Sequence, residues 1–149
     1  MPRSTNLLIF PDLNVWVALA YDQHVHHSAS RRWFEQLPTG TRLYFCRFTQ
    51  IGFLRLLTTG AVMGPGRVMS QSQAWKEYDR WFTDDRIGFL EEPPGLEEKF
   101  RLFSHTEHPS RRDWADAYLA AFAAAAELCL VTFDRGFRGR VNDVQILEG

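Results

Sequence analysis

Five short apolar runs alternate with segments of helical pattern along this chain, and this alternation limits the folds open to it. The runs expected as strands cover residues 7–10, 43–46, 87–90, 128–133 and 144–147. Runs that are apolar at nearly every position are typical of strands buried on both faces. Strands that alternate with helices in a short chain predict a parallel sheet between two layers of helices. We therefore predict an α/β/α sandwich of four to five parallel strands, with residues 1–149 forming a single domain.

The segments between these runs carry the signals of helices. The expected helices cover residues 15–21, 28–37, 49–57, 70–82, 96–103 and 111–128. Ser28 is expected to cap the second of them, and Gly60 to end the third. The last helix is the most strongly predicted, because it is rich in alanine and free of Gly and Pro.

Composition and charge narrow the class of protein. The formal net charge of -1 argues against a strongly cationic nucleic-acid binder, although it leaves room for a local basic patch. Only Lys76 and Lys99 among the 17 basic residues are lysines. Arginine binds phosphate with two hydrogen bonds, so this bias suits an RNA or DNA substrate, and it also suits a genome of biased base composition. Cys46 and Cys129 are expected to be buried free thiols of a reducing cytosol.

The N-terminus and the apolar runs bear on localisation. No charged segment followed by a long apolar one opens the chain, so no signal peptide is expected. No apolar run reaches the roughly 18 to 20 residues that a membrane span requires. We therefore expect a cytoplasmic protein that does not bind a membrane.

Asp12 follows the first expected strand and precedes a helical run. Pro11 is expected to break the strand ladder, and Asp12 and Asn14 then present short oxygen-bearing side chains. In open parallel sheets, ligands bind at the carboxyl ends of the strands, which would place Asp12 at the edge of a functional crevice. The alternative is that Asp12 or Asn14 only caps the next helix.

Two further stretches repeat this pattern. Asp134 follows the buried strand 128–133, and Thr132 lies where it could orient Asp134 or a bound water. Asp113 and Asp116 lie three residues apart at the start of the alanine-rich helix and share a face. Asp113 could instead stabilise the helix dipole, and Asp134 could simply begin a turn before Gly136.

Three converging carboxylates repel one another unless one is protonated or a cation binds. We expect Asp12, Asp116 and Asp134 to meet at one edge of the sheet. Carboxylate oxygens completed by water suit Mg²⁺ or Mn²⁺. Such a site can activate a water and stabilise charge on a phosphodiester, so the residues point to metal-dependent phosphoryl chemistry.

Several stretches together match one family in its order. They are Asp12 to Val15, His24 to His27 with Ala29 and Trp33, Thr49 to Thr58, Trp114 to Ala121, and Thr132 to Phe137. With them the chain resembles the PIN domain family, most closely the VapC-type ribonuclease toxins of type II toxin–antitoxin systems. The resemblance implies a Mg²⁺-dependent endoribonuclease that cleaves RNA, forms a homodimer and is neutralised by a small VapB-like antitoxin.

The resemblance assigns roles to individual residues. Asp12, Asp116 and Asp134 fall on the acidic positions that bind metal and catalyse cleavage, and Asn14 and Thr132 match the polar supports. One position departs from the pattern, because many relatives carry a glutamate where this chain has Gly52. Asp113 is a candidate to compensate for it. A PIN fold that binds RNA or a partner without cleaving is therefore the alternative function.

Other residues have candidate roles that the pattern leaves open. Arg55, Arg135, Arg138 and Arg140 could bind RNA phosphates, or could be solvated surface residues. The aromatic stripe of Trp75, Tyr78, Trp81 and Phe82 could be core, or could face a second subunit or an antitoxin helix. His24 and His27 are expected to fix the loop between the first two helices, since zinc would require more ligands nearby.

Two other folds of this class fit the sequence poorly. A phosphotransferase of the haloacid-dehalogenase type, with Asp12 as nucleophile, would have a second aspartate where Asn14 stands and a lysine late in the chain. No lysine follows Lys99. A flavodoxin-like cofactor binder would have a phosphate-binding loop after the first strand, and none is present.

Overall fold

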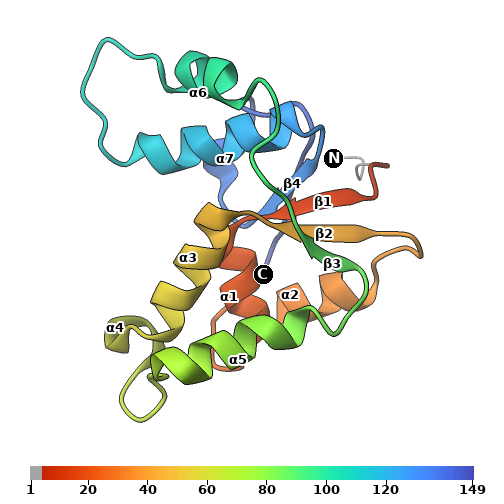
Figure 1. Ribbon diagram of the computed structural model, residues 1–149, viewed down its shortest axis with the longest axis vertical. Helices are drawn as coiled ribbons and strands as arrows, with labels where there is room; N and C mark the ends of the chain where they lie inside the picture. The colour runs from red at the N-terminus through yellow and green to blue at the C-terminus, as the bar shows by residue number, and fades with distance from the viewer. Residues whose placement is uncertain (1–4) are drawn as a thin grey trace.

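The computed structural model describes residues 5–149 and contains a five-stranded sheet in which all paired strands are parallel (Figure 1). Its strands, in the spatial order β3-β2-β1-β4-β5, are β1 (Leu8–Pro11), β2 (Arg42–Phe45), β3 (Ile87–Phe89), β4 (Cys129–Thr132) and β5 (Val144–Ile146). The helices are α1 (Leu13–Ala20), α2 (His27–Glu35), α3 (Arg47–Leu57), α4 (Gly60–Met63), α5 (Gln71–Trp81), α6 (Leu96–Ser104), α7 (Asp113–Ala125) and the 3-10 turn η1 (Arg135–Phe137). None of the helices within residues 5–149 has the length and apolar character of a membrane span. The predicted α/β/α architecture is confirmed.

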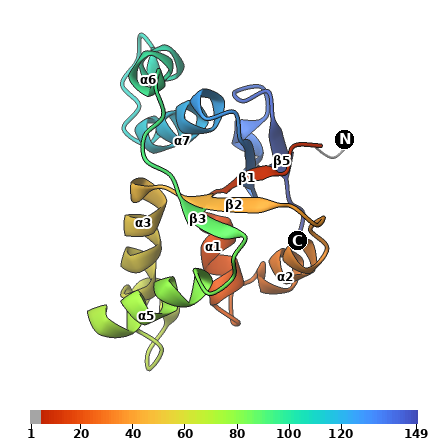
Figure 2. The same cartoon turned by 45° about the vertical axis from the view of Figure 1, so that its right-hand side comes forward.

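The helices cover the two faces of the sheet as separate layers. Helices α1, α2, α3 and α5 lie on one side, and α6 and α7 lie on the other (Figure 2). Because side chains alternate along a strand, Ile9 joins the core beneath α1 while Phe10 joins the core beneath α7. Phe10 stacks on Phe122 of α7 with ring centroids 4.8 Å apart. A buried strand with two apolar faces therefore links two cores.

The order of the elements fixes where a site can form. The chain leaves β1 directly into α1 and leaves β2 directly into α3, so both helices begin at the carboxyl edge of the sheet. Helix α3 begins with a capping box in which the Cys46 N–H donates to the Thr49 hydroxyl at 2.9 Å. The chain also passes from β4 into η1 at this edge. Polar residues just beyond β1 and β4 are thus brought together, because these two strands are neighbours.

Pro11 does not break the strand ladder, contrary to the prediction, and is the last residue of β1. It pairs with Val131 in the ladder between β1 and β4. The Asp12 N–H donates to the Val131 carbonyl at 2.8 Å, so the nitrogen of Pro11, one residue earlier, points the opposite way, toward β2. Pairing of β1 with β2 is already complete at Ile9, and a missing N–H on that side therefore costs no ladder hydrogen bond.

Two predicted helix boundaries are also wrong. Ser28 lies inside α2, which begins after His26 without a side-chain cap. Gly60 does not stop α3, which ends at Leu57; it is the first residue of the short helix α4. The helix predicted over 70–82 is present as α5, and Ser70 is its N-cap, with its hydroxyl accepting the Gln73 N–H at 3.1 Å.

Candidate active site

Asp12 combines the two roles that its sequence context allows. It is the N-cap of α1, and its Oδ1 accepts the Leu13 N–H at 2.6 Å. Its Oδ2 accepts a hydrogen bond from the Thr132 hydroxyl at 2.7 Å. The side chain is 7% exposed, and it lies at the carboxyl end of a central strand. The Leu13 N–H and the Thr132 hydroxyl together hold the Asp12 carboxylate in one orientation.

Thr132 is the centre of the hydrogen-bond network at this edge. Its side chain is fully buried, and its hydroxyl donates to Asp12 while accepting the Asp134 N–H at 3.0 Å. The Asn14 amide contacts the same hydroxyl at 3.4 Å, and its carbonyl accepts the Phe133 N–H at 3.4 Å. Thr132 therefore contacts Asp12 directly, and Asn14 contacts Thr132.

Asp134 lies just beyond β4, and Asp116 reaches the same edge from α7 in the other helical layer. Asp134 caps η1, with its Oδ1 accepting the Gly136 N–H at 2.7 Å, and it is exposed. Asp116 lies in the first turn of α7 and is partly buried. The predicted turn at Asp134 is thus present, and within residues 5–149 only one of its two carboxylate oxygens accepts a hydrogen bond.

Burial and mutual repulsion disfavour ionisation of two of these carboxyls. Burial is the main cause that raises the pKa of Asp12, and the charges of Asp116 and Asp134 raise it further, against the hydrogen bonds from Thr132 and Leu13. Burial, then the charge of Asp134, raises the pKa of Asp116, while Arg140 opposes the rise. Asp12, Asp116 and Asp134 therefore lie within electrostatic range of one another.

The donor set has the chemistry of a hard divalent cation site. Asp12, Asp116 and Asp134 offer carboxylate oxygens, and a cation between them would relieve the repulsion that raises two of their pKa values. Within residues 5–149, however, no three His, Cys, Asp or Glu side chains lie close enough together to hold one ion as placed. Binding of one ion by all three aspartates would therefore require their carboxylates to move closer together.

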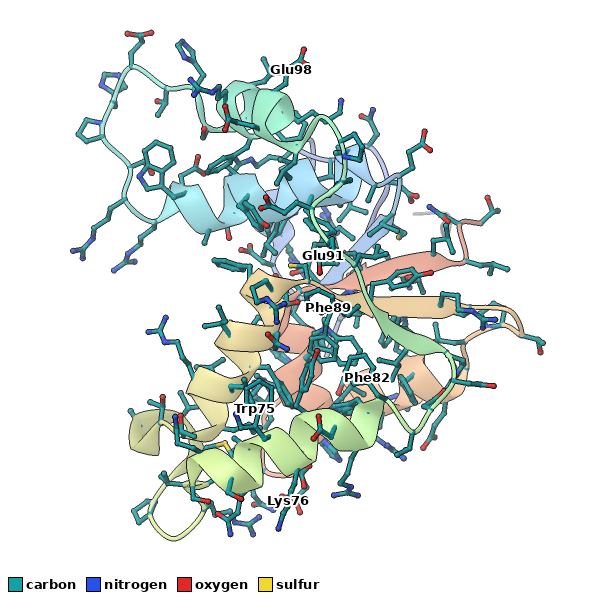
Figure 3. The ribbon with its side chains drawn as sticks, in the orientation of Figure 1. Trp75, Lys76, Phe82, Phe89, Glu91 and Glu98 are labelled. Atoms are coloured by element: carbon teal, nitrogen blue, oxygen red, sulfur yellow. The ribbon has the colours of Figure 1, made fainter. Side chains whose placement is uncertain are left out.

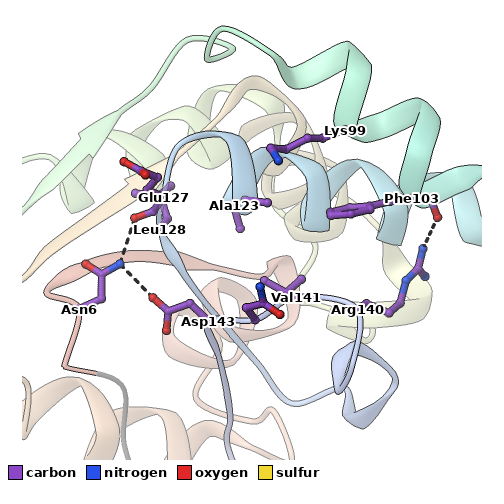
Figure 4. A pocket seen from close by; sticks show the side chains of 11 residues that line it. Asn6, Lys99, Phe103, Ala123, Glu127, Leu128, Arg140, Val141 and Asp143 are labelled. Atoms are coloured by element: carbon purple, nitrogen blue, oxygen red, sulfur yellow. Dashed lines mark hydrogen bonds between the residues drawn. The ribbon is translucent and has the colours of Figure 1, made fainter.

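Asp113 and Arg140 pair with each other rather than with a ligand. The Arg140 guanidinium contacts Asp113 at 2.5 Å. It also donates to the Phe103 carbonyl at 3.0 Å, a hydrogen bond that Figure 4 shows. Both side chains are less than one-third exposed, at 25% and 30%. The phosphate-binding role considered for Arg140 would require breaking this pair. Asp113 reaches the acidic site through its charge, which raises the pKa of Asp116.

The other candidate arginines are more accessible. Arg135 is only within 4.0 Å of Glu148, and both side chains are about 70% exposed. Arg138 is exposed and follows η1 directly. Arg55 is exposed on α3, where it lines a groove with Trp75 of α5. Arg135 and Arg138 therefore flank Asp134, whereas Arg55 lies on the opposite layer from α7.

Leu13 occupies the space where a side chain at position 52 would begin. A Cβ atom built on Gly52 would lie 2.6 Å from Leu13 Cδ2, well inside van der Waals contact. Leu13 follows Asp12 and donates its N–H to that carboxylate. Any residue larger than glycine at position 52 must therefore displace the side chain that adjoins Asp12.

A well-formed cavity lies at the other edge of the sheet. It has a volume of about 540 Å³ and is bounded by residues that precede β1, β4 and β5, among them Asn6, Leu128 and Asp143 (Figure 4). The Asn6 amide donates to the Asp143 carboxylate and to the Glu127 carbonyl, both at 3.0 Å. None of the three candidate aspartates lines this cavity.

The aromatic stripe of α5 is divided between core and surface. Tyr78 is buried, and Trp81 and Phe82 pack against the core. Trp75 is 47% exposed and faces α3, with Lys76 on the opposite side of α5 (Figure 3). The core assignment is therefore confirmed for three of the four rings.

The histidine loop lies closer to the site than the sequence indicated. His27 Nδ1 lies 2.7 Å from the Ala18 carbonyl, and His24 Nδ1 accepts the His26 N–H at 3.0 Å, so both histidines fix the loop as expected. His26 stacks on Phe133, with ring centroids 4.3 Å apart, directly before Asp134. Only the pattern His24 to His27 hinted at this contact.

Comparison with known proteins identifies the family of this chain. The PIN domain family matches residues 9–141. Ribonuclease VapC41 of Mycobacterium tuberculosis is 41% identical over 133 residues, which cover 87% of this chain and 91% of the relative. The chain therefore belongs to the PIN domain family, and its resemblance there is to the VapC-type ribonucleases.

Solved structures share the fold at low identity. VapBC2 from Rickettsia felis, bound to a DNA fragment from its promoter, aligns with a TM-score of 0.66 and 11% identity over 95% of this chain and 99% of its own. VapC20 of Mycobacterium tuberculosis, a toxin that cleaves the sarcin–ricin loop, aligns with a TM-score of 0.65 and 17% identity over 94% and 99%. At these identities the likeness concerns the fold alone.

Thr132→Val is expected to damage the site more than the loss of one hydroxyl suggests. Valine has the same shape, but it leaves Asp12 Oδ2 without its donor and the Asp134 N–H without its acceptor. A cost of about 1–3 kcal/mol in the free energy of unfolding follows, measurable by urea denaturation. Thr132→Ser keeps the hydroxyl and is the matched control; equal stability of the Val and Ser variants would contradict the network.

The raised pKa of Asp12 predicts how the stability of the metal-free protein depends on pH. Between the ordinary aspartate pKa, about 4, and the raised folded value, the native state binds more protons than the unfolded state. Stability contributed by this group is therefore present at low pH and lost as pH rises through the folded pKa. In EDTA, the Tm of Asp12→Asn minus the Tm of the wild type is therefore expected to increase as the pH is raised from about 4 to about 7.

Proposed function

We propose that this chain is a Mg²⁺- or Mn²⁺-dependent endoribonuclease, the toxin of a toxin–antitoxin pair. One observation carries the proposal: Asp12, Asp116 and Asp134 are brought within electrostatic range at the carboxyl edge of a PIN-family sheet. VapC41 is named a ribonuclease, and VapC20 is described as a toxin that cleaves RNA of the sarcin–ricin loop. We further propose a cytoplasmic homodimer that a VapB-like antitoxin neutralises.

Residues of the chain would hold the cation and orient the carboxylates that bind it. Asp12, Asp116 and Asp134 would hold the cation, which when bound lowers the pKa of its water and stabilises charge on the phosphodiester. The Leu13 N–H and the Thr132 hydroxyl orient Asp12, and the same hydroxyl fixes the backbone of Asp134. Because the pKa values of Asp12 and Asp116 are raised, mainly by burial, protons compete with the cation at these carboxylates up to a higher pH than at an ordinary aspartate.

Removal and return of the metal tests this function. The purified protein is incubated with total bacterial RNA in EDTA, and Mg²⁺ or Mn²⁺ is then added in excess. We expect discrete RNA fragments only after the cation is restored, with Ca²⁺ as a control of equal charge that favours more ligands. Cleavage at full rate in EDTA would contradict the proposed metal dependence.

A second candidate is a PIN fold that binds RNA or a partner without cleaving. The contact between Leu13 and the position of Gly52 favours it, because the space that a fourth carboxylate would enter is filled. RNA binding without cleavage, across Mg²⁺, Mn²⁺ and a range of RNA substrates, would select this candidate. A double variant, Leu13→Ala with Gly52→Glu, would then be expected to gain affinity for Mn²⁺ over Leu13→Ala alone.

A further inference from the structure

Four aromatic rings form a row that crosses α7 and ends at the start of α3. Trp114 meets Phe100 edge to face at 6.1 Å, and Phe100 meets Tyr118 in the same manner at 5.7 Å. Tyr118 then contacts Phe48 at 5.4 Å. We refer to Trp114, Phe100, Tyr118 and Phe48 as the aromatic row. It joins α6, α7 and the first turn of α3 at the carboxyl edge of the sheet.

The two ends of the row are open to solvent, and its middle rings are packed and partly buried. Trp114 is 58% exposed and Phe48 is 38% exposed, whereas Tyr118 and Phe100 are partly buried. The Tyr118 hydroxyl donates to Glu92 Oε2 at 2.7 Å, and its ring contacts both Phe100 and Phe48. The row therefore has a packed middle and an exposed ring at each end.

The row lies beside the acidic site. Trp114 stands between Asp113 and Asp116 in the first turn of α7, and Phe48 lies three residues beyond the end of β2. Trp114 also lines an open groove of about 500 Å³ with Arg101, Ser104 and His105. Trp114 and Phe48 are therefore exposed rings on elements that begin at the same edge of the sheet as the aspartates.

Two exposed arginines precede Trp114 in the chain and suit a polyanion, although Asp113, Asp116 and Glu97 are also nearby. Arg111 and Arg112 directly precede α7 and are exposed, and no ion pair with either is formed within residues 5–149. Arg101, by contrast, is paired with Glu97 at 3.1 Å. Exposed aromatic rings beside unpaired arginines are the usual platform for single-stranded nucleic acid, in which bases stack on rings and phosphates bind guanidinium groups.

We propose that the aromatic row binds the single-stranded RNA substrate next to the cleaved bond, with bases stacked on Trp114 and Phe48 and backbone phosphates on Arg111 and Arg112. This inference rests on the proposed ribonuclease function and adds to it the surface that holds the substrate. The row would thus contribute to which unpaired segments of RNA are cleaved.

The test measures binding separately from cleavage. Fluorescein-labelled poly(U) is titrated in EDTA with the wild type, Trp114→Ala, Phe48→Ala and Trp75→Ala, and binding is followed by anisotropy. Trp75 is the matched control, since it is a similarly exposed tryptophan (47%) that lies on α5. We expect Kd to rise roughly 5- to 100-fold for each row variant, the range for loss of one stacked base, and to stay unchanged for Trp75→Ala.

Two further readouts distinguish stacking from a structural role. Bound poly(U) is expected to quench tryptophan emission less in Trp114→Phe than in Trp75→Phe, while Trp114→Phe retains most of the affinity. Replacing Arg111 and Arg112 together with glutamine is expected to reduce the slope of log Kd against log salt by roughly 1.4, at about 0.7 for each single-strand phosphate contact.

The outcomes separate this inference from the proposed function. Unchanged poly(U) affinity in both row variants, with an active wild type, would overturn the inference alone. A change in elution volume on gel filtration without a change in RNA affinity would also overturn it, because the row would then be a protein interface. Weaker binding by the row variants, with no cleavage by the wild type in any divalent cation, would uphold the row and overturn the ribonuclease function.

Discussion

Asp12→Asn is expected to lower the rate of Mg²⁺-dependent RNA cleavage by on the order of 100-fold or more. A bound cation contributes several kcal/mol to stabilisation of the transition state, and each 1.4 kcal/mol corresponds to about a factor of ten. Asparagine keeps an oxygen that can accept the Leu13 N–H or the Thr132 hydroxyl, so the local fold is retained. What it removes is the negative charge. Single-turnover cleavage of a labelled RNA measures the effect.

The control for this variant is its stability. Because burial and neighbouring charges raise the pKa of Asp12, its ionised form costs stability in the absence of metal. Asp12→Asn should therefore melt at the same temperature as the metal-free wild type or higher at neutral pH. A site that is more stable without its charge is common where function opposes stability. Cleavage at the wild-type rate by a folded Asp12→Asn protein would remove Asp12 from the proposed site.

Phe45→Ala is expected to destabilise the fold by about 3–5 kcal/mol, the largest effect on stability that we predict. Phe45 is fully buried at the end of β2 and stacks on Trp16, with ring centroids 4.0 Å apart. It also meets Tyr78 edge to face at 4.9 Å and Phe53 at 5.8 Å. Since many domains are stable by only about 5–15 kcal/mol, the variant would lose a large share of its stability.

Phe48→Ala is the matched control for this loss. It removes the same ring three residues further along the chain, from a side chain that is 38% exposed. We expect its free energy of unfolding, measured by urea denaturation, to fall by much less than that of Phe45→Ala. In this account the buried Phe45 ring holds α1 and α5 to the sheet, and the exposed Phe48 ring does not. Equal losses in the two variants would contradict it.

The sequence was sufficient to predict the layers of the fold and the edge of the sheet at which Asp12 and Asp134 lie. Apolar runs that end at a polar residue indicated β1 and β4 and their carboxyl ends. This pattern placed Asp12 just beyond β1 and Asp134 just beyond β4. It also placed Thr132 correctly, because alternation along β4 and the position of Asp134 leave few orientations for its hydroxyl. Periodicity is informative for such features because burial of the strands imposes it.

Pairings between distant side chains could not be predicted in this way. Asp113 and Arg140 are 27 residues apart and meet only because the chain after η1 returns to α7. The contact of Leu13 with the position of Gly52 likewise depends on how α1 packs on α3. Pro11 was misjudged because its nitrogen points to the side of β1 where pairing has ended, which is a matter of sheet order. Each error concerns tertiary packing that overrides a local preference.

Calorimetric titration with Mn²⁺ tests the central claim most directly, because it needs no knowledge of the RNA target. The wild type, Asp12→Asn and Asp113→Asn are titrated under identical conditions, and Asp113→Asn serves as the control because Arg140 already pairs with that carboxylate. We predict saturable binding of Mn²⁺ to the wild type, displaced by excess Mg²⁺, that is lost in Asp12→Asn and largely retained in Asp113→Asn. Equal Mn²⁺ affinity in the wild type and Asp12→Asn would contradict a metal site built on Asp12.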